Sequence, residues 1–270
     1  MPKEVFKEYA TKSAIEETIQ EALDILEADD GKSFEEKKEA LIKHLQKHQE
    51  PVLIGALADL ATADKAGQQI KDNFWSFGEI TCPDRNIILR NVSAADREGY
   101  LLMQREYSLM KHMLNEPVYC DMVWNEQLDP KALMLTITIG SEYVGYCGIK
   151  NTTEADWEIA IEILPQWTKA GIGYIALSGM LTAIKARLGI AQFRVRIDPS
   201  NYASQRLFDK LGAVPNGISE FLIHDQNALE KCEEENLHLI DEHLRAVADK
   251  FGVEPRKLLS HVLEFTLQWP

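Results

Sequence analysis

The chain has 270 residues, 45% of them hydrophobic and 27% charged, which is ordinary for a soluble globular protein of one large domain or two modest ones. No apolar run approaches the roughly 20 residues that span a bilayer, and the opening M-P-K-E-V-F-K-E is too acidic and mixed for a signal or transit peptide. The net charge of −14 argues against nucleic acid or an anionic membrane as a partner. We therefore expect a cytoplasmic protein with no nucleic-acid partner and no membrane partner.

Four cysteines are spread along the chain, at Cys82, Cys120, Cys147 and Cys232. They form no C-x-x-C pair, which indicates reduced thiols rather than a disulfide framework or a zinc site. His44 and His48 have helical spacing, but they sit among lysines with no third ligand nearby and indicate a solvated helix face. We expect no metal site.

The first 80 residues show the apolar spacing of helices. Ser13 begins an S-x-x-E capping box before a first helix over 15–26, and Ser33 begins a second box before a helix over 34–45. A third helix is expected from about Pro51 to residue 60. Three short helices predict a small bundle over 1–80, packed beside the main domain and without a catalytic constellation.

From residue 86 the pattern changes to strands. Residues 87–92 are β-prone, and Ser93 is suited to cap a helix that carries Tyr100, Leu101, Tyr107 and Leu109. Residues 133–139 and 143–150 flank a Ser141-Glu142 turn, which predicts a hairpin.

Residues 157–214 are the most informative part of the sequence. A predicted strand over 158–164 runs through a glycine turn, K-A-G-I-G at 169–173, into an amphipathic helix over 174–188. The free backbone N–H groups and the positive dipole end of such a helix form a pyrophosphate site. A second strand over 192–198 leads to N-Y-A-S at 201–204, which begins a helix that ends at Gly212.

After Asp225 the pattern is again helical. One apolar stripe runs from Leu229 to Phe251 and stops at Gly252, and Pro255 begins a last predicted helix. That last helix would carry Leu258, Leu259, Val262 and Phe265. We expect a C-terminal helical extension over 226–270, with stripes that serve packing within the chain or a homodimer surface rather than a separate binding function.

The order of these elements resembles the GNAT family of N-acetyltransferases over residues 86–224, and most closely the branch that includes the ribosomal-protein N-terminal acetyltransferases. The motifs that carry it are W-E-I at 157–159, L-P-Q-W at 164–167, G-I-G at 171–173 and N-Y-A-S-Q-R-L-F-D-K-L-G at 201–212. The resemblance implies an α/β (α+β) domain over 81–225, with a mixed, splayed sheet flanked by helices and extra helical segments at both termini. It also implies acetyl transfer from acetyl-CoA to an amine by direct attack in a ternary complex.

The resemblance assigns the cofactor contacts. Backbone groups of 162–164 would pair with the pantetheine arm and polarise the thioester carbonyl, and the glycine turn would hold the pyrophosphate. The implied cofactor-binding residues are Ile163, Leu164, Lys169, Ala170, Gly171, Ile172, Gly173, Tyr174 and Asn201. Three positions depart from the family pattern. In the phosphate loop Thr168 stands where Gln or Arg is usual and Ala170 where Gly or Lys is often found, and Phe208 stands where many members carry a tyrosine that protonates the thiolate.

Glu158 and Glu162 are the candidates for the general base. With Ala160 they alternate along the predicted strand and share one face, beside the expected cofactor site. Glu158 is the preferred base and Glu162 the second candidate, and the competing interpretation is a solvated sheet surface. The resemblance implies that Asn201 binds pantetheine and Ser204 protonates the thiolate, although Asn201 is equally suited to cap its helix.

The acceptor is a primary amine whose identity the sequence leaves open. Tyr107, Tyr119, Trp124 and Tyr143 are candidates for an acceptor pocket or for the core. The acidic excess in 1–80 and 222–270 favours a cationic acceptor, such as a polyamine or a peptide or protein N-terminus. The alternative function is an acyl-CoA-binding regulatory or interaction module with weak catalysis, which Thr168 and Phe208 favour.

Overall fold

The computed structural model describes residues 36–37, 40, 43, 51–220 and 225–270, with only the backbone given for 51–61. Contacts within the chain divide it into two compact units, residues 1–63 and 64–270. The apolar residues that predicted helices at 15–26 and 34–45 lie outside the described residues. The third predicted helix is present as α4 and is longer than expected, at Pro51–Trp75. The domain boundaries at 80/81 and 225/226 stay predictions.

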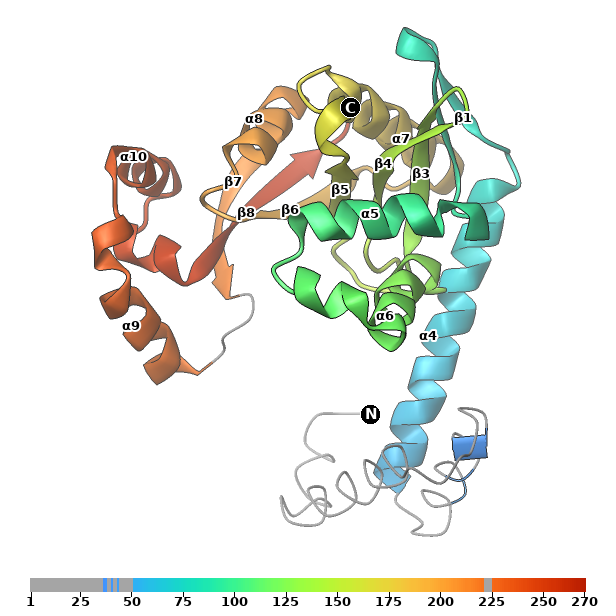
Figure 1. Ribbon diagram of the computed structural model, residues 1–270, viewed down its shortest axis with the longest axis horizontal. Helices are drawn as coiled ribbons and strands as arrows, with labels where there is room; N and C mark the ends of the chain where they lie inside the picture. The colour runs from blue at the N-terminus through green and yellow to red at the C-terminus, as the bar shows by residue number, and fades with distance from the viewer. Residues whose placement is uncertain (1–35, 38–39, 41–42, 44–50, 221–224) are drawn as a thin grey trace. The chain divides into compact units, whose positions relative to one another are not determined.

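A five-stranded antiparallel sheet forms the first layer of the second unit, with its strands side by side in chain order (Figure 1). The strands are β1 (Ile80–Cys82), β2 (Ile87–Asn91), β3 (Leu133–Ile139), β4 (Glu142–Ile149) and β5 (Ile159–Ile163). The predicted hairpin is confirmed as β3 and β4, whereas β1 was not predicted.

Helices cover both faces of this sheet (Figure 1). Along β3, β4 and β5 the side chains alternate between two cores. Odd-numbered residues such as Ile137 and Cys147 join the main core with α7 (Ile172–Leu188), and even-numbered ones such as Met134 and Ala160 join a second core. The parity is reversed before the bulge of β4, where Val144 joins the main core and Tyr143 packs against the second. The second core lies under α5 (Arg97–Tyr107) and α6 (Pro117–Leu128).

The helix predicted after Ser93 is confirmed. Ser93 and Asp96 form a capping box at a 3₁₀ turn that leads into α5. The helix ends at Tyr107, so Leu109 lies beyond it and is exposed. The second helix of this pair, α6, was not predicted.

A three-stranded antiparallel sheet follows, in the order β6-β8-β7. Its strands are β6 (Gln192–Ile197), β7 (Val214–Glu220) and β8 (His261–Gln268). The helix predicted through Val262 and Phe265 is wrong, because these residues belong to β8. The segment H-V-L-E-F-T-L-Q also alternates with period two, and Leu263, Phe265 and Leu267 are fully buried.

The rest of the C-terminal segment is helical, as expected, but in two helices. They are α9 (Gln226–Glu235), capped by Asp225, and α10 (Glu242–Phe251), capped by Asp241 and ended by Gly252. The predicted single stripe is therefore interrupted. Among the residues that the structure describes, no helix is both long and apolar enough to cross a membrane.

The two sheets meet at one end and separate at the other, which confirms the mixed, splayed arrangement. Glu158 and Arg194 form a parallel bridge, and the Arg194 N–H donates to the Trp157 carbonyl at 2.9 Å. Beyond this bridge β5 and β6 are the outer strands of different sheets. We call the region between them the fork.

Candidate active site

The edge of β5 that faces the fork carries the backbone groups of Ile161 and Ile163. In an antiparallel pair the backbone groups point alternately toward and away from the partner strand. The Lys150 N–H donates to the Glu158 carbonyl at 3.0 Å and the Leu164 N–H to the Val144 carbonyl at 2.9 Å, so even-numbered residues of β5 pair with β4. The odd-numbered residues are left for a ligand, and we call their side of β5 the open edge.

Of the segment expected to pair with pantetheine, Ile163 lies on the open edge and Leu164 does not. The Leu164 N–H is bonded to Val144, and its carbonyl accepts from the Trp167 N–H at 2.9 Å. Its side chain is buried in the second core. Leu164 therefore holds the end of the strand, and Ile161 replaces it as the second residue, beside Ile163, whose backbone groups face the open edge.

The glycine turn lies at the N-terminus of α7, as predicted. Gly171 is the N-cap, with φ of +79°, and a Cβ there would meet nothing within 4 Å. The first helical bond runs from the Ile175 N–H to the Gly171 carbonyl at 3.2 Å. The N–H groups of Ile172, Gly173 and Tyr174 precede it and have no acceptor within the helix. The turn thus offers an anion several donors beside the fork.

Gly173 brings this turn against the open edge. A Cβ at Gly173 would lie 3.3 Å from Leu207 Cδ2, 3.4 Å from Ile163 Cδ1 and 3.5 Å from Ile161 Cδ1. The absence of a side chain lets α7 pack closely on both β5 and α8 (Tyr202–Leu211). The anion site and the open edge are therefore adjacent.

The polar and charged side chains of the turn have separate tasks. The Thr168 hydroxyl donates to the Pro165 carbonyl at 2.8 Å, so it closes the preceding turn. Lys169 is exposed, with φ of +61°, and Ala170 packs partly against the main core. Lys210 of α8 is a second cation near the turn, and the sequence did not predict it. Its Nζ lies 4.1 Å from the centre of the Tyr174 ring.

Asn201 caps α8, as the simpler interpretation predicted. Its Oδ1 accepts from the Ser204 N–H at 3.0 Å, which places the half-buried Ser204 in the first turn. The other departure from the family pattern, Phe208, is 3% exposed and belongs to the main core. That position therefore serves packing in this chain.

Glu162 lies in the second-core face of β5, directly opposite Tyr146 of β4. Gln104 Nε2 donates to Glu162 Oε2 at 3.0 Å. Burial raises the pKa of Glu162 to about 7, and the charge of Glu126 adds to the rise. Gln104 and Lys150 act in the opposite direction. A carboxyl group with a pKa near neutrality is suited to take a proton from a substrate.

Glu158 shares this face, as predicted, but its surroundings are opposite in charge. The side chain is 5% exposed, with Lys150 Nζ at 2.5 Å from Oε1. Arg196 Nε lies 2.8 Å and Arg194 Nη2 3.3 Å from Oε2. Burial alone would raise the pKa of Glu158, but the bonds and charges of Lys150 and Arg196 outweigh it and hold the pKa below its usual value. Such a carboxylate is a weak base.

One of the four candidate aromatic residues lies at the open edge. The Tyr107 hydroxyl donates to the Ile163 carbonyl at 2.7 Å, and the side chain is 46% exposed. Trp124 is buried against Tyr100, with ring centres 5.8 Å apart. Tyr119 and Tyr143 pack at the margin of the second core.

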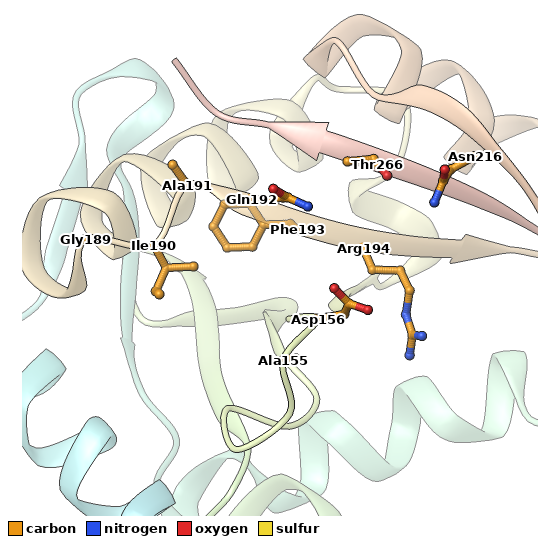
Figure 2. A pocket seen from close by; sticks show the side chains of 10 residues that line it. All are labelled: Ala155, Asp156, Gly189, Ile190, Ala191, Gln192, Phe193, Arg194, Asn216 and Thr266. Carbon is orange, nitrogen blue, oxygen red and sulfur yellow. The ribbon is translucent and has the colours of Figure 1, made fainter.

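A pocket of about 340 Å³ lies elsewhere (Figure 2). Its lining includes Asp156, Gln192, Arg194 and the glycine that ends α7, Gly189. The glycine turn is at the other end of the same helix. This pocket is therefore separate from the fork opening and contains none of the predicted site residues.

The chain is similar to known acetyltransferases. Residues 86–214 match a family model described as an acetyltransferase (GNAT) domain. No curated protein sequence matches the chain significantly. Several solved structures are similar to the chain at low identity, with TM-scores below 0.5.

Among them is RimJ from Mycobacterium smegmatis in complex with CoA-disulfide, at 15% identity over 71% of this chain and 86% of that one, with a TM-score of 0.48. The microcin C7 self-immunity acetyltransferase MccE, in complex with acetyl-CoA and AMP, is 14% identical over 69% and 94%, with a TM-score of 0.48. A chimera of the spermidine N-acetyltransferase SpeG from Vibrio cholerae and hSSAT is 13% identical over 67% and 95%, with a TM-score of 0.47.

Proposed function

Since this chain belongs to the GNAT family of acetyltransferases, we propose that it transfers the acetyl group of acetyl-CoA to a primary amine by direct attack in a ternary complex. The observation that carries this proposal is the meeting of three parts at the fork. They are the glycine turn with its free N–H groups, the open edge of β5, and the carboxyl group of Glu162 with its raised pKa.

The acetyl-CoA pyrophosphate binds the N–H groups of residues 171–174, with Lys169 and Lys210 as the nearby cations. The pantetheine arm runs along the open edge and pairs with the backbone of Ile161 and with the N–H of Ile163, whose carbonyl accepts from Tyr107. Asn201 uses its oxygen for the helix cap, and its amide NH₂ remains a donor for the arm.

The chemistry follows from the groups at the fork. Glu162 takes a proton from the acceptor ammonium, and the resulting amine attacks the thioester carbonyl, whose oxygen is polarised by a backbone N–H of the open edge. The C–N bond forms and the C–S bond breaks; the departing thiolate takes a proton from a hydroxyl donor, and the second proton lost by the attacking nitrogen restores that donor. Ser204 is the donor in this proposal, because Phe208 has no proton to give and lies in the core.

The acceptor we favour is the amino terminus of a polypeptide. The surface over α5, α6 and the segment between them carries several exposed large hydrophobic residues, among them Tyr107 at the open edge. Its exposed members are Leu102, Tyr107, Leu109, Met110, Val118 and Met122. A peptide that places its amine at Glu162 would lay its next side chains on this surface.

A polyamine is the second candidate, since Glu126 adds a second carboxylate in the electrostatic range of Glu162. The further alternative, an acyl-CoA-binding module with weak catalysis, is favoured by Thr168 and Phe208. The first is bonded within its own turn, and the second is buried. We place the activity in the cytoplasm, a compartment consistent with four free cysteines.

The decisive experiment measures thiol release from acetyl-CoA with a panel of amines, beside calorimetric binding of acetyl-CoA. The panel contains peptides with apolar residues at positions two and three, the same peptides blocked at the amino terminus, and spermidine. We expect turnover with the free peptides and none with the blocked ones. Binding without thiol release for any amine would favour the module, and no binding would refute the proposed use of acetyl-CoA.

A further inference from the structure

The fork is closed at its narrow end around a single carboxylate, Glu158. Lys150 follows the end of β4, Glu158 precedes β5, and Arg194 and Arg196 belong to β6. The four side chains thus lie on or directly beside three neighbouring strands, β4 and β5 of one sheet and β6 of the other. We call this cluster the fork brace.

The contacts of the fork brace cross the point at which β5 and β6 separate. Arg194 is joined to β5 twice, through its backbone N–H to the Trp157 carbonyl at 2.9 Å and through its guanidinium to Glu158 at 3.3 Å. Arg196 lies two residues further along β6, where the strands have already parted. Its Nε reaches back to the same carboxylate at 2.8 Å. Glu158 therefore ties β6 to β5 on the opening side of the bridge.

The charge of the carboxylate is essential to this arrangement. Glu158 is almost fully buried, and three cationic groups face it. Removing its charge would leave these cations in a partly desolvated site without the carboxylate they share, and the strands that carry them would move apart. A change in that separation would alter the gap into which the pantetheine arm fits.

We infer that Glu158 is a positioning residue that fixes the separation of β5 and β6 at the cofactor site through Arg194 and Arg196, and that it takes no part in proton transfer. The inference rests on the proposed path of pantetheine along the open edge. It gives the preferred base candidate of the sequence a different task, in cofactor binding.

The test compares Glu158→Gln with a matched control, Glu233→Gln. Glu233 of α9 has a fully buried side chain and is held by Arg256, Lys257 and Ser260, but it lies away from the fork. Both substitutions remove a buried carboxylate and lower stability. Only Glu158→Gln should weaken acetyl-CoA binding in calorimetry, by about tenfold or more, because only this carboxylate joins the strands at the cofactor site.

The kinetic split separates positioning from catalysis. At saturating acetyl-CoA the Glu158→Gln enzyme should keep its kcat within about threefold, while the KM for acetyl-CoA rises. Glu158→Asp, which keeps the charge, should recover most of the affinity. If Glu158→Gln does not fold, Arg194→Lys tests the same tie, since it keeps the cation and loses the guanidinium contact.

Three results would overturn the inference: unchanged acetyl-CoA affinity in the folded Glu158→Gln variant, an equal loss in Glu233→Gln, or a kcat loss with unchanged KM. The last would make Glu158 the base. The proposed function fails separately, when the unsubstituted protein itself binds no acetyl-CoA.

Discussion

Glu158 and Glu162 lie four residues apart on one face of the same strand segment, but their surroundings shift their pKa values in opposite directions. Around Glu158 three cations stabilise the ionised form, so its pKa is lowered. Around Glu162 there are tyrosines, one amide donor and a second carboxylate; burial outweighs the effects of Gln104 and Lys150, so its pKa is raised. Paired titratable groups whose pKa values are driven apart are characteristic of divided roles. The position of a carboxylate on a strand therefore identifies it as a candidate base, whereas the charges and burial contributed by neighbouring elements decide which candidate has the raised pKa.

The largest expected effect is the loss of kcat in Glu162→Gln. Since the amide cannot take a proton from the acceptor ammonium, kcat should fall by about 100-fold or more. Acetyl-CoA affinity should stay unchanged in calorimetry, because the side chain lies on the α5 side and the cofactor is expected at the backbone edge. A variant that keeps its kcat would remove Glu162 from the base role.

Stability should separate the two residues next. Glu158→Gln should lower the free energy of unfolding by about 2–3 kcal/mol, an amount reduced from that of a fully buried ion pair because the partners are partly exposed. Glu162→Gln should cost nothing at pH 8, since it removes a buried carboxylate that is ionised at that pH. Chemical denaturation of both variants measures this. Equal losses would show that the two surroundings are energetically alike.

The pH dependence provides a third comparison. The proposed base must be ionised, so kcat/KM should fall about tenfold per pH unit below an apparent pKa of about 7, the value for Glu162. The raised pKa also means that this residue favours the folded state below its unfolded pKa and loses that contribution as pH rises through 7. The acid limb should be absent in Glu162→Gln and present in Glu158→Gln. A limb that disappears only in Glu158→Gln would reverse the assignment.

The smallest expected effect is that of a substitution in the glycine turn. It is the reference against which the changes in acetyl-CoA affinity and in the pH–rate profile of the two glutamate variants are compared. Gly171 has φ of +79°, so Gly171→Ala strains the backbone by about 1 kcal/mol without a steric clash. Acetyl-CoA affinity should fall about fivefold, because the bound cofactor requires the positive φ that alanine adopts only at this cost. The acid limb of the rate profile should not move. Affinity equal to that of the unsubstituted protein would show that the turn is not held in this conformation by the ligand.

Much of the fold was predictable, because its signals are local. Ser93, Gly171 and Gly212 mark helix ends within a few residues of the turns they make, and the β3–β4 hairpin follows from alternation. The last strand was not predictable in this way. Val262 and Phe265 fit a helical pattern, whereas Leu263, Phe265 and Leu267 fit a period-two pattern. The strand forms because this segment pairs with both β6 and β7, and only the tertiary fold provides these partners.

In the candidate site, too, the features with a local sequence signal were predictable and those set by distant residues were not. Alternation correctly placed Glu158 and Glu162 on one face, and the G-I-G motif located the turn. Which carboxylate is the base depends on distant residues. Arg194 and Arg196 follow Glu158 by 36 and 38 residues, and Gln104 precedes Glu162 by 58. A lone glutamine or arginine has no local signal that would connect it with a particular carboxylate.

The place of β8 has a consequence for how the site is made during synthesis. β8 is the middle strand of the second sheet and pairs with both β6 and β7, although α9 and α10 come before it in the chain. β6, which carries both arginines of the fork, therefore lacks its sheet partner until residues 261–268 have left the ribosome. Closing such a long loop before pairing is intrinsically slow. A nascent chain would form the first sheet and the glycine turn early, and would complete the second wall of the fork only after β8 has emerged.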